Sequence, residues 1–511
     1  MLFNSHIFIF CFFPIFYLLY LSLVNFKFLT KKKLFLILII IFSLFFYSYW
    51  NLGYLPIILI SIIINYFFSK ILLKKINKYF IFLPILFNIL LLFYYKYFPV
   101  IHGFLNEKNI VFQNIIIPLG ISFFTFQQIG YLIELKNDKK KKLSFLEYFS
   151  FVIFFPQLIA GPILKVEEFF PKIIESVKFK NLLKNFLLGL IIFFIGLGKK
   201  VIIADNIAIY IDNFYQVAEI KGNINFYESW LASIGYIFQL YFDFSGYSDM
   251  AIGLARFFGL DLPCNFNSPL KRKSIQDFWR TWHITLTRFT TNYIFTGLMI
   301  KLSNYNLNFK LIFAVSASIT FLLIGAWHGA GLNFLIFGII HAFAYLVNKV
   351  YSFYIQNRNI KFLLSPKMNF IYWILTFSVV VISFVFFRSP STDIAINIVA
   401  TMTNFNSLLF PEFFFNNNFL VYIMEILNAQ SITTYVFLGH ELLIFVLVCL
   451  IIVLIFPNTQ NISKISNNII FDREKKYSLS SKFILMIFFA FVLFSSLMSL
   501  NNNKIFLYYQ F

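Results

Sequence analysis

Charged residues are scarce in this 511-residue chain, where they make up 12% of the sequence. Ordinary soluble domains carry about 25%. Hydrophobic residues account for 60%, and phenylalanine alone occurs 76 times. A soluble protein of this length has no interior large enough to hide so much apolar surface. The scarcity of charge therefore excludes a soluble globular protein and indicates that lipid surrounds much of the chain.

Cysteine is equally rare. Cys11, Cys264 and Cys449 lie far apart and form neither a CxxC pair nor a metal-ligand spacing. We interpret them as isolated thiols that pack like small apolar side chains. The sequence also lacks Walker, HExxH and GxSxG motifs. We therefore expect no bound cofactor and no metal site.

Acidic residues number 21 against 42 basic ones, which gives a formal net charge of +21. Many basic residues gather in short loops between apolar runs, for example at 31–33, 74–75, 139–142 and 199–200. This pattern is typical of the cytoplasmic loops of membrane proteins. The chain has no basic, aromatic-rich soluble domain that could bind a polynucleotide, so we expect no nucleic-acid partner.

Long apolar runs dominate the rest of the sequence. A helix needs about 20 apolar residues to cross a hydrocarbon layer of about 30 Å, and many runs here approach that length. Lipid-exposed strands cannot satisfy their backbone groups, so the runs must be helical. We predict an all-α, multi-pass integral membrane protein with roughly 10–13 membrane-embedded helices. We interpret the first run, from residue 7 to 28, as a membrane helix, because no small-residue cleavage site follows it.

The stretch 262–293 is polar, basic and rich in aromatic residues. Ser274 can cap a helix that begins near Ile275, with Asp277 at the third helical position. On that helix Asp277 and Arg280 lie three residues apart and could form an ion pair.

Trp279 and His283 of the same stretch are candidates for an active site. Trp279 and His283 are four residues apart, so on one helix they would share a face. The pattern equally fits an interfacial helix in the lipid headgroup plane, with His283 at its polar rim. The residue pattern alone leaves both interpretations open.

His328 stands at the end of a nearly uncharged run, FLLIGAWHGAG at 321–331. Ionisable residues in such runs are rare and usually face a cavity or the interior of a helix bundle. Gly325, Gly329 and Gly331 would let backbone or substrate approach closely and could break the helix. A histidine there is suited to accept a proton from a hydroxyl. The alternative is a structural histidine that hydrogen-bonds across helices.

His341 follows thirteen residues later, about 220° around an ideal helix from His328. We expect it to have a supporting or core role, and the two rings to share a face only if the glycines break the helix. Within 236–250, polar residues interrupt another apolar run: Asp243, Ser245, Tyr247 and Asp249. They fit either a polar pocket that pairs with Lys273 or Arg280, or a helix terminus.

Six motifs, in this order, resemble those of the membrane-bound O-acyltransferase family. They are PLGISFFTFQ (118–127), PQLIAGPI (156–163), YFDFSGYSDMAIGLARFFG (241–259), NFNSP (265–269), SIQDFWRTWHITLT (274–287) and WHGAGLNFLIFGIIHA (327–342). The resemblance is to the bacterial polysaccharide branch, typified by alginate O-acetylases and teichoic-acid D-alanyl transferases. It implies a helical bundle with a tunnel or funnel. It also implies a division into N-terminal membrane helices (1–50), a catalytic core (51–390) and a C-terminal region (391–511).

The resemblance also implies roles for single residues. His328 matches the family's catalytic histidine, and His283 matches a second active-site histidine of this branch. Pocket or supporting positions within or near the motifs are Trp279, Arg280, Trp327, Asn333, His341, Asp243 and Tyr247. The chain departs from the branch where Thr291 and Asn292, instead of an Arg-Asp pair, precede Tyr293.

The chain ends in FLYYQF, which resembles the aromatic end of some relatives, including peptidoglycan O-acetylases. By that resemblance Tyr508 would carry the acyl group to a periplasmic partner. The alternative is a belt of aromatic side chains at the membrane interface.

Together these features predict a membrane O-acyltransferase of the bacterial inner membrane. The resemblance implies acetyl-CoA as donor, an SGNH-type O-acetyltransferase as periplasmic partner, and a polysaccharide or peptidoglycan as acceptor. The alternatives are a transporter or flippase for a polysaccharide precursor and a purely structural membrane subunit. A transporter would also contain polar and glycine-interrupted spans.

Overall fold

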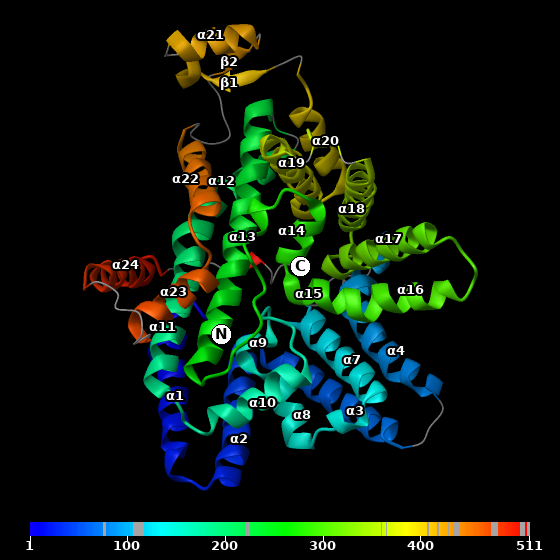
Figure 1. Cartoon of the computed structure of the whole chain (residues 1–511), viewed down its shortest axis with the longest axis vertical. Coiled ribbons are helices and arrows are strands. Elements are labelled where there is room, and N and C mark those ends of the chain that lie inside the picture. Colours follow the sequence, from blue (N-terminus) through cyan, green and yellow to red (C-terminus); the bar gives the residue numbers. More distant parts are fainter. Residues whose placement is uncertain are drawn as a thin grey trace. The chain divides into compact units, whose positions relative to one another are not determined.

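The computed structural model describes most of the chain. It leaves out residues 75–77, 106–116, 221, 223, 359, 364, 406–407, 416–417, 428, 433–439, 472–478, 501–505 and 508–511. The described residues are mainly helical, and they include one short parallel strand pair, β1 (Leu409–Pro411) with β2 (Gln430–Ile432). The helices in Figure 1 confirm the predicted all-α architecture.

The chain divides into two compact units. Unit 1 comprises Met1–Val201, Phe244–Asn265 and Thr459–Phe511, and unit 2 comprises Ile202–Asp243 and Phe266–Asn458. Helix α13 (Phe226–Phe257) contributes residues to both. The other helices of unit 1 are α1 (Phe13–Ser22), α2 (Phe28–Ser48), α3 (Leu55–Leu72), α4 (Phe82–Leu92), α5 (Phe98–Leu105), α7 (Ile121–Asn137), α8 (Phe145–Ile153), α9 (Phe155–Leu158), α10 (Val166–Ser176), α11 (Leu182–Gly198), α23 (Thr459–Phe471) and α24 (Leu479–Met498).

Unit 2 contains the segments that the sequence singled out for chemistry. Its other helices are α12 (Asp205–Glu219), α14 (Ile275–Thr281), α15 (Ile284–Thr290), α16 (Thr296–Ser303), α17 (Phe309–His328), α18 (Leu332–Arg358), α19 (Asn369–Arg388), α20 (Thr392–Met402), α21 (Asn418–Ile426) and α22 (Glu441–Ile455).

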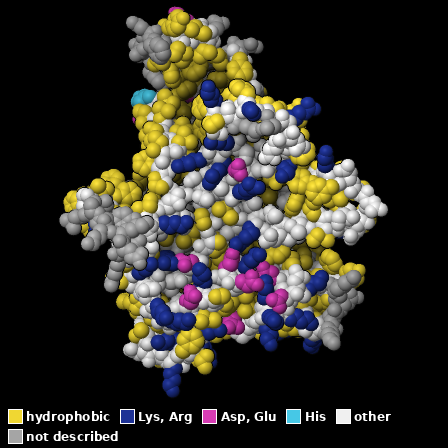
Figure 2. All heavy atoms as spheres, in the orientation of Figure 1, with side chains coloured by type: hydrophobic (Ala, Val, Ile, Leu, Met, Phe, Trp, Pro, Cys, Tyr) yellow, Lys and Arg dark blue, Asp and Glu magenta, His cyan; other side chains and the backbone are white. Residues whose placement is uncertain are grey.

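Seven helical stretches among the described residues are long and apolar enough to cross a membrane. They are Phe8–Asn25, Leu52–Leu72, Tyr79–Ile101, Leu182–Glu219, Phe309–His328, Leu332–Arg358 and Pro366–Arg388. The bent pair α22–α23 would make an eighth. Hydrophobic side chains form several patches on the face seen in Figure 2, with Lys and Arg side chains between them. The protein is thus a multi-pass membrane protein, and the higher count of membrane-embedded segments stays a prediction.

Glycines permit close helix contacts in both units. In unit 1 a Cβ added to Gly246 of α13 would lie 2.7 Å from the carbonyl oxygen of Gly196 in α11. In unit 2 a Cβ on Gly325 of α17 would lie 2.3 Å from the carbonyl oxygen of Phe334 in α18. Both distances are too short for a real side chain, so only glycine permits these backbones to approach.

Candidate active site

Helix α14 begins as the sequence predicted. The Ser274 hydroxyl accepts a hydrogen bond of 3.0 Å from the backbone N–H of Asp277. Asp277 in turn accepts one of 3.2 Å from Arg280. The cap and the ion pair are therefore confirmed. The Arg280 side chain is 74% exposed, so the structure places it at the surface and apart from the buried residues described next.

The end of α14 differs from the prediction. The helix stops at Thr281, and His283 instead precedes α15, with φ 42° and ψ 54° in the left-handed region. The expectation that Trp279 and His283 share a face of one helix is therefore wrong. The interpretation of His283 as a residue of the polar rim is also wrong, because it is 1% exposed.

The unusual backbone at His283 follows a contact between the end of α14 and a segment outside the helix. The N–H of Asn267 donates to the carbonyl of Thr281, a contact of 3.0 Å from outside the helix that holds the chain where α14 ends. Left-handed non-glycine residues are uncommon and concentrate at functional sites. Burial lowers the pKa of His283 to about 3, so its imidazole is neutral near pH 7.

His328 is the last residue of α17 and is buried. Its ring lies 4.9 Å from those of Trp327 and Phe387 and 6.0 Å from that of Phe337. Helix α17 ends here and α18 starts at Leu332. The Gly-Ala-Gly segment 329–331 between the two helices therefore breaks the helix, as predicted. The break lets α18 turn back along α17 in a tight helical hairpin.

Trp327 is the neighbour that the two histidines share. Its ring lies 6.1 Å from that of His283 and 4.9 Å from that of His328. All three side chains are buried. The structure therefore brings together, in one aromatic cluster, two histidines that are 45 positions apart in the sequence.

His341 lies in the same cluster and makes two hydrogen bonds. Nε1 of Trp279 donates to Nδ1 of His341 over 3.2 Å, and Nε2 of His341 lies 2.9 Å from Oγ of Ser383 in α19. The Phe337 ring is 4.6 Å from His341 and also contacts His328. Ser383 was missed by sequence reasoning, since its only signal is one small hydroxyl within an apolar run.

Asn333 fixes the end of α19 beside the cluster. Its side-chain amide donates to the carbonyls of Phe386 (3.1 Å) and Ser389 (2.9 Å). Phe387, which contacts the His328 ring, lies between those two residues. Asn333 therefore positions the wall of the site from the first turn of α18.

The polar residues within 236–250 were expected either to form a pocket with Lys273 or Arg280 or to mark a helix terminus, and the structure shows a different arrangement. They lie in the middle of the continuous helix α13, so the prediction of a helix terminus is wrong. Asp243 is buried in unit 2. Asp249 pairs at 2.6 Å with Lys199 of unit 1, a different basic residue from Lys273 and Arg280.

Tyr247 belongs to unit 1, where its ring lies 4.8 Å from that of Phe506. Lys200 lies over the same Phe506 ring at 4.5 Å. Phe506 is buried, so this residue of the C-terminal motif is packed into unit 1. Tyr508 lies outside the described residues.

The chemistry available in the cluster is that of imidazoles among aromatic rings. A neutral imidazole accepts a proton at one nitrogen and donates a hydrogen bond from the other. Among the described residues, no group of three or more His, Cys, Asp or Glu side chains could hold a metal ion. The residues present therefore fit proton transfer to and from a substrate.

Comparison with known proteins identifies the family and several relatives of this chain. The model of the "MBOAT, membrane-bound O-acyltransferase family" matches residues 110–389. A peptidoglycan O-acetyltransferase of Helicobacter pylori is 38% identical over 444 residues, which cover 80% of this chain and 81% of that protein. A probable alginate O-acetylase of Pseudomonas aeruginosa is 30% identical, covering 81% and 76%.

A third relative extends the range of acceptors among these proteins. A teichoic acid D-alanyltransferase of Bacillus subtilis is 30% identical over 326 residues, which cover 61% of this chain and 79% of that protein. The family match spans the segments that carry His283, His328 and His341. The chain is therefore an acyltransferase that belongs to the membrane-bound O-acyltransferase family.

Proposed function

We propose that this protein transfers an acetyl group from cytoplasmic acetyl-CoA, through the inner membrane, to a cell-wall or extracellular polysaccharide. Peptidoglycan is the first acceptor to test, because the relative with 38% identity is a peptidoglycan O-acetyltransferase. The observation that carries the proposal is the burial of His328 at the end of α17, beside the tryptophan that it shares with His283.

His328 acts as the general base in this proposal. Its imidazole takes the proton of an attacking hydroxyl while the hydroxyl oxygen bonds to the thioester carbonyl carbon. The tetrahedral intermediate then collapses, the carbon–sulfur bond breaks, and the protonated imidazole returns the proton to the leaving thiolate. The products are an acetyl ester and free CoA.

His283 serves the same step without exchanging a proton. As a neutral imidazole it can donate one hydrogen bond to the thioester oxygen, where negative charge develops in the transition state. The buried Trp327 ring contacts both histidine rings and contributes apolar surface beside them. His341, which is held by Trp279 and Ser383, acts as a positioning residue.

The attacking hydroxyl in the first transfer is that of Tyr508. The resemblance of the terminal FLYYQF motif supports this assignment, and Phe506 of that motif packs against Tyr247 in unit 1. The acetyl-tyrosine then donates to a periplasmic SGNH-type O-acetyltransferase, which esterifies the polysaccharide. Without Tyr508, the acceptor hydroxyl itself would have to reach His328.

The test is replacement of His328 by Gln, which keeps a hydrogen-bonding side chain of similar size but cannot accept a proton. We expect the variant to insert and purify normally and to lose wall O-acetyl esters and CoA release by about 100-fold or more. Wall acetylation at the wild-type level would refute the role of His328. A wild-type protein that moves a precursor without releasing CoA would instead support the transporter alternative.

A further inference from the structure

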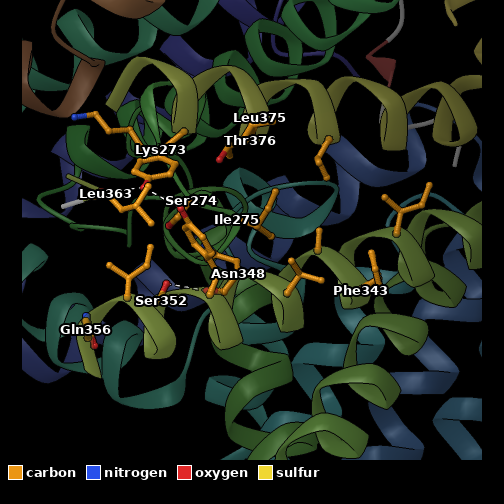
Figure 3. A pocket seen from close by; sticks show the side chains of 17 residues that line it. Lys273, Ser274, Ile275, Phe343, Asn348, Ser352, Gln356, Leu363, Leu375 and Thr376 are labelled. Atoms are coloured by element: carbon orange, nitrogen blue, oxygen red, sulfur yellow. Dashed lines mark hydrogen bonds between the residues drawn. The ribbon is translucent and has the colours of Figure 1, made fainter. Parts of the chain in front are cut away.

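A groove of about 590 Å³ lies in unit 2 next to the histidine cluster. It runs between α18 and α19 and is closed on one side by the residues that start α14 (Figure 3). His283, His328 and His341 do not line it. The groove is therefore a separate feature of the fold.

The two ends of the groove differ in chemistry. The polar side chains that line the groove include Lys273, Gln356 and Tyr372, and the apolar ones include Leu363, Phe343 and Val379. Figure 3 shows Lys273 and Gln356 toward one end and Phe343 toward the other. The Tyr372 hydroxyl is 3.0 Å from that of Tyr351 and donates to a backbone carbonyl. This gradient matches an amphiphile with a polar head and a long apolar tail.

The charge at the polar end is one-sided. Asp277 is the only acidic residue in the sequence from 266 to 388, and it pairs with Arg280. Lys271 and Arg272 donate to the backbone carbonyls of Phe456 and Asn267. Lys273 makes neither an ion pair nor a hydrogen bond with the part of the chain that the structure describes. Its ammonium group is thus available to a negatively charged head group.

From this geometry we propose that the groove binds an anionic diacyl phospholipid of the bilayer. The phosphate lies at Lys273 beside the tyrosine hydroxyls, and an acyl chain follows the groove toward Phe343. Phe343 is 70% exposed in the protein alone, as expected for a side chain that lipid covers. Acetyl-CoA also carries phosphates, but its pantetheine arm contains two amides and a hydroxyl, so the apolar end of the groove suits the hydrocarbon chain of a lipid better.

The bound lipid would also stabilise the active site through two helices that line both the groove and the histidine cluster. Ile275 of α14 and Ile340 of α18 both line the groove. Ile340 directly precedes His341, and α14 carries Trp279, its hydrogen-bond donor. A lipid that contacts both helices therefore holds together the Trp279–His341 pair.

The experiment measures lipid retained by the purified full-length protein, using native mass spectrometry after equal exposure to phosphatidylglycerol and phosphatidylcholine. We expect wild type to retain more phosphatidylglycerol than phosphatidylcholine. Lys273→Gln should reduce that preference by about fivefold, the effect of one cation near a charged surface. Ala344→Trp, which fills the groove, should reduce retention of both lipids.

Two control variants make the same kinds of substitution at positions outside the groove. Lys361→Gln removes an exposed lysine, and Val350→Trp adds an indole to an exposed position of α18 that does not line the groove. Both should retain lipid as wild type does. Equal retention of the two lipids by wild type, or equal losses in the controls, would overturn the proposal. Displacement of the lipid by acetyl-CoA would do so as well, since it would assign the groove to the donor.

Discussion

Trp279 donates its indole N–H to Nδ1 of His341, and this contact fixes the protonation state of the histidine. An indole nitrogen can only donate, so Nδ1 must accept and the ring proton must lie on Nε2. Nε2 then donates to Ser383, whose hydroxyl donates to the carbonyl of Val380. A protonated His341 would turn a second N–H toward the indole, so this ring is suited to a structural role and not to that of a base.

The first prediction concerns this chain of hydrogen bonds. Trp279→Phe leaves the buried Nδ1 of His341 without its donor, which should lower the free energy of unfolding by about 1–3 kcal/mol. Residual acetyl transfer should stay well above that of His328→Gln, with an unchanged pH profile. Thermal unfolding and CoA release measure both effects. Complete loss of activity in a folded Trp279→Phe protein would show that Trp279 does more than position His341.

The second prediction uses the buried position of His283. Its folded-state pKa is lowered to about 3, below the ordinary value of about 6.5, so between these values the unfolded chain binds more protons. Stability is therefore fully present above about pH 6.5 and is lost as pH falls, by up to about 1.4 kcal/mol per pH unit.

His283→Asn is the matched variant, because asparagine tolerates the left-handed backbone at this position and does not titrate. Its unfolding midpoint should depend less on pH between 6.5 and 4 than that of wild type. The measurement is thermal unfolding in detergent across that range. Parallel curves for the two proteins would mean that His283 contributes nothing to the acid sensitivity.

The third prediction tests the glycine contact between α17 and α18. Gly325→Ala would place a Cβ 2.3 Å from the carbonyl oxygen of Phe334, so the two helices must separate. We expect a loss of about 1–3 kcal/mol in stability together with reduced activity. Gly297→Ala in α16 is the control, because a Cβ there meets no atom within 4 Å, and alanine favours the helix. Equal behaviour of the two variants would contradict the close packing.

The fourth prediction separates two adjacent tyrosines. Tyr508→Phe should abolish acetyl transfer to the periplasmic partner, because phenylalanine has no hydroxyl to esterify. Tyr509→Phe changes the neighbouring residue in the same way and should leave transfer intact. The measurement is mass spectrometry of the C-terminal peptide after incubation with labelled acetyl-CoA. Label on the peptide of Tyr508→Phe would assign the acyl group to another residue.

Several features could be predicted from the sequence because they depend on neighbouring residues or on composition alone. The scarcity of charge and the long apolar runs indicated a helical membrane protein. The cap at Ser274 and the ion pair of Asp277 with Arg280 involve residues three apart, which any helix brings together. The break after His328 follows from its glycines.

Other features depend on contacts between distant segments. Asn267 meets the end of α14 and so helps place His283 in a left-handed backbone, where the sequence suggested a continuous helix. The polar residues within 236–250, for which the sequence allowed a helix terminus, instead lie inside α13, where Gly246 packs against the backbone of Gly196.

The candidate site shows the same division. Its histidines could be recognised from the sequence, because an ionisable ring in an apolar run is conspicuous. Their arrangement around Trp327, and the partner that Ser383 provides to His341, were decided by the tertiary structure. Local propensity specifies where a helix starts. Contacts between helices depend instead on how the whole bundle packs, because packing decides which distant side chains come within a few ångströms of one another.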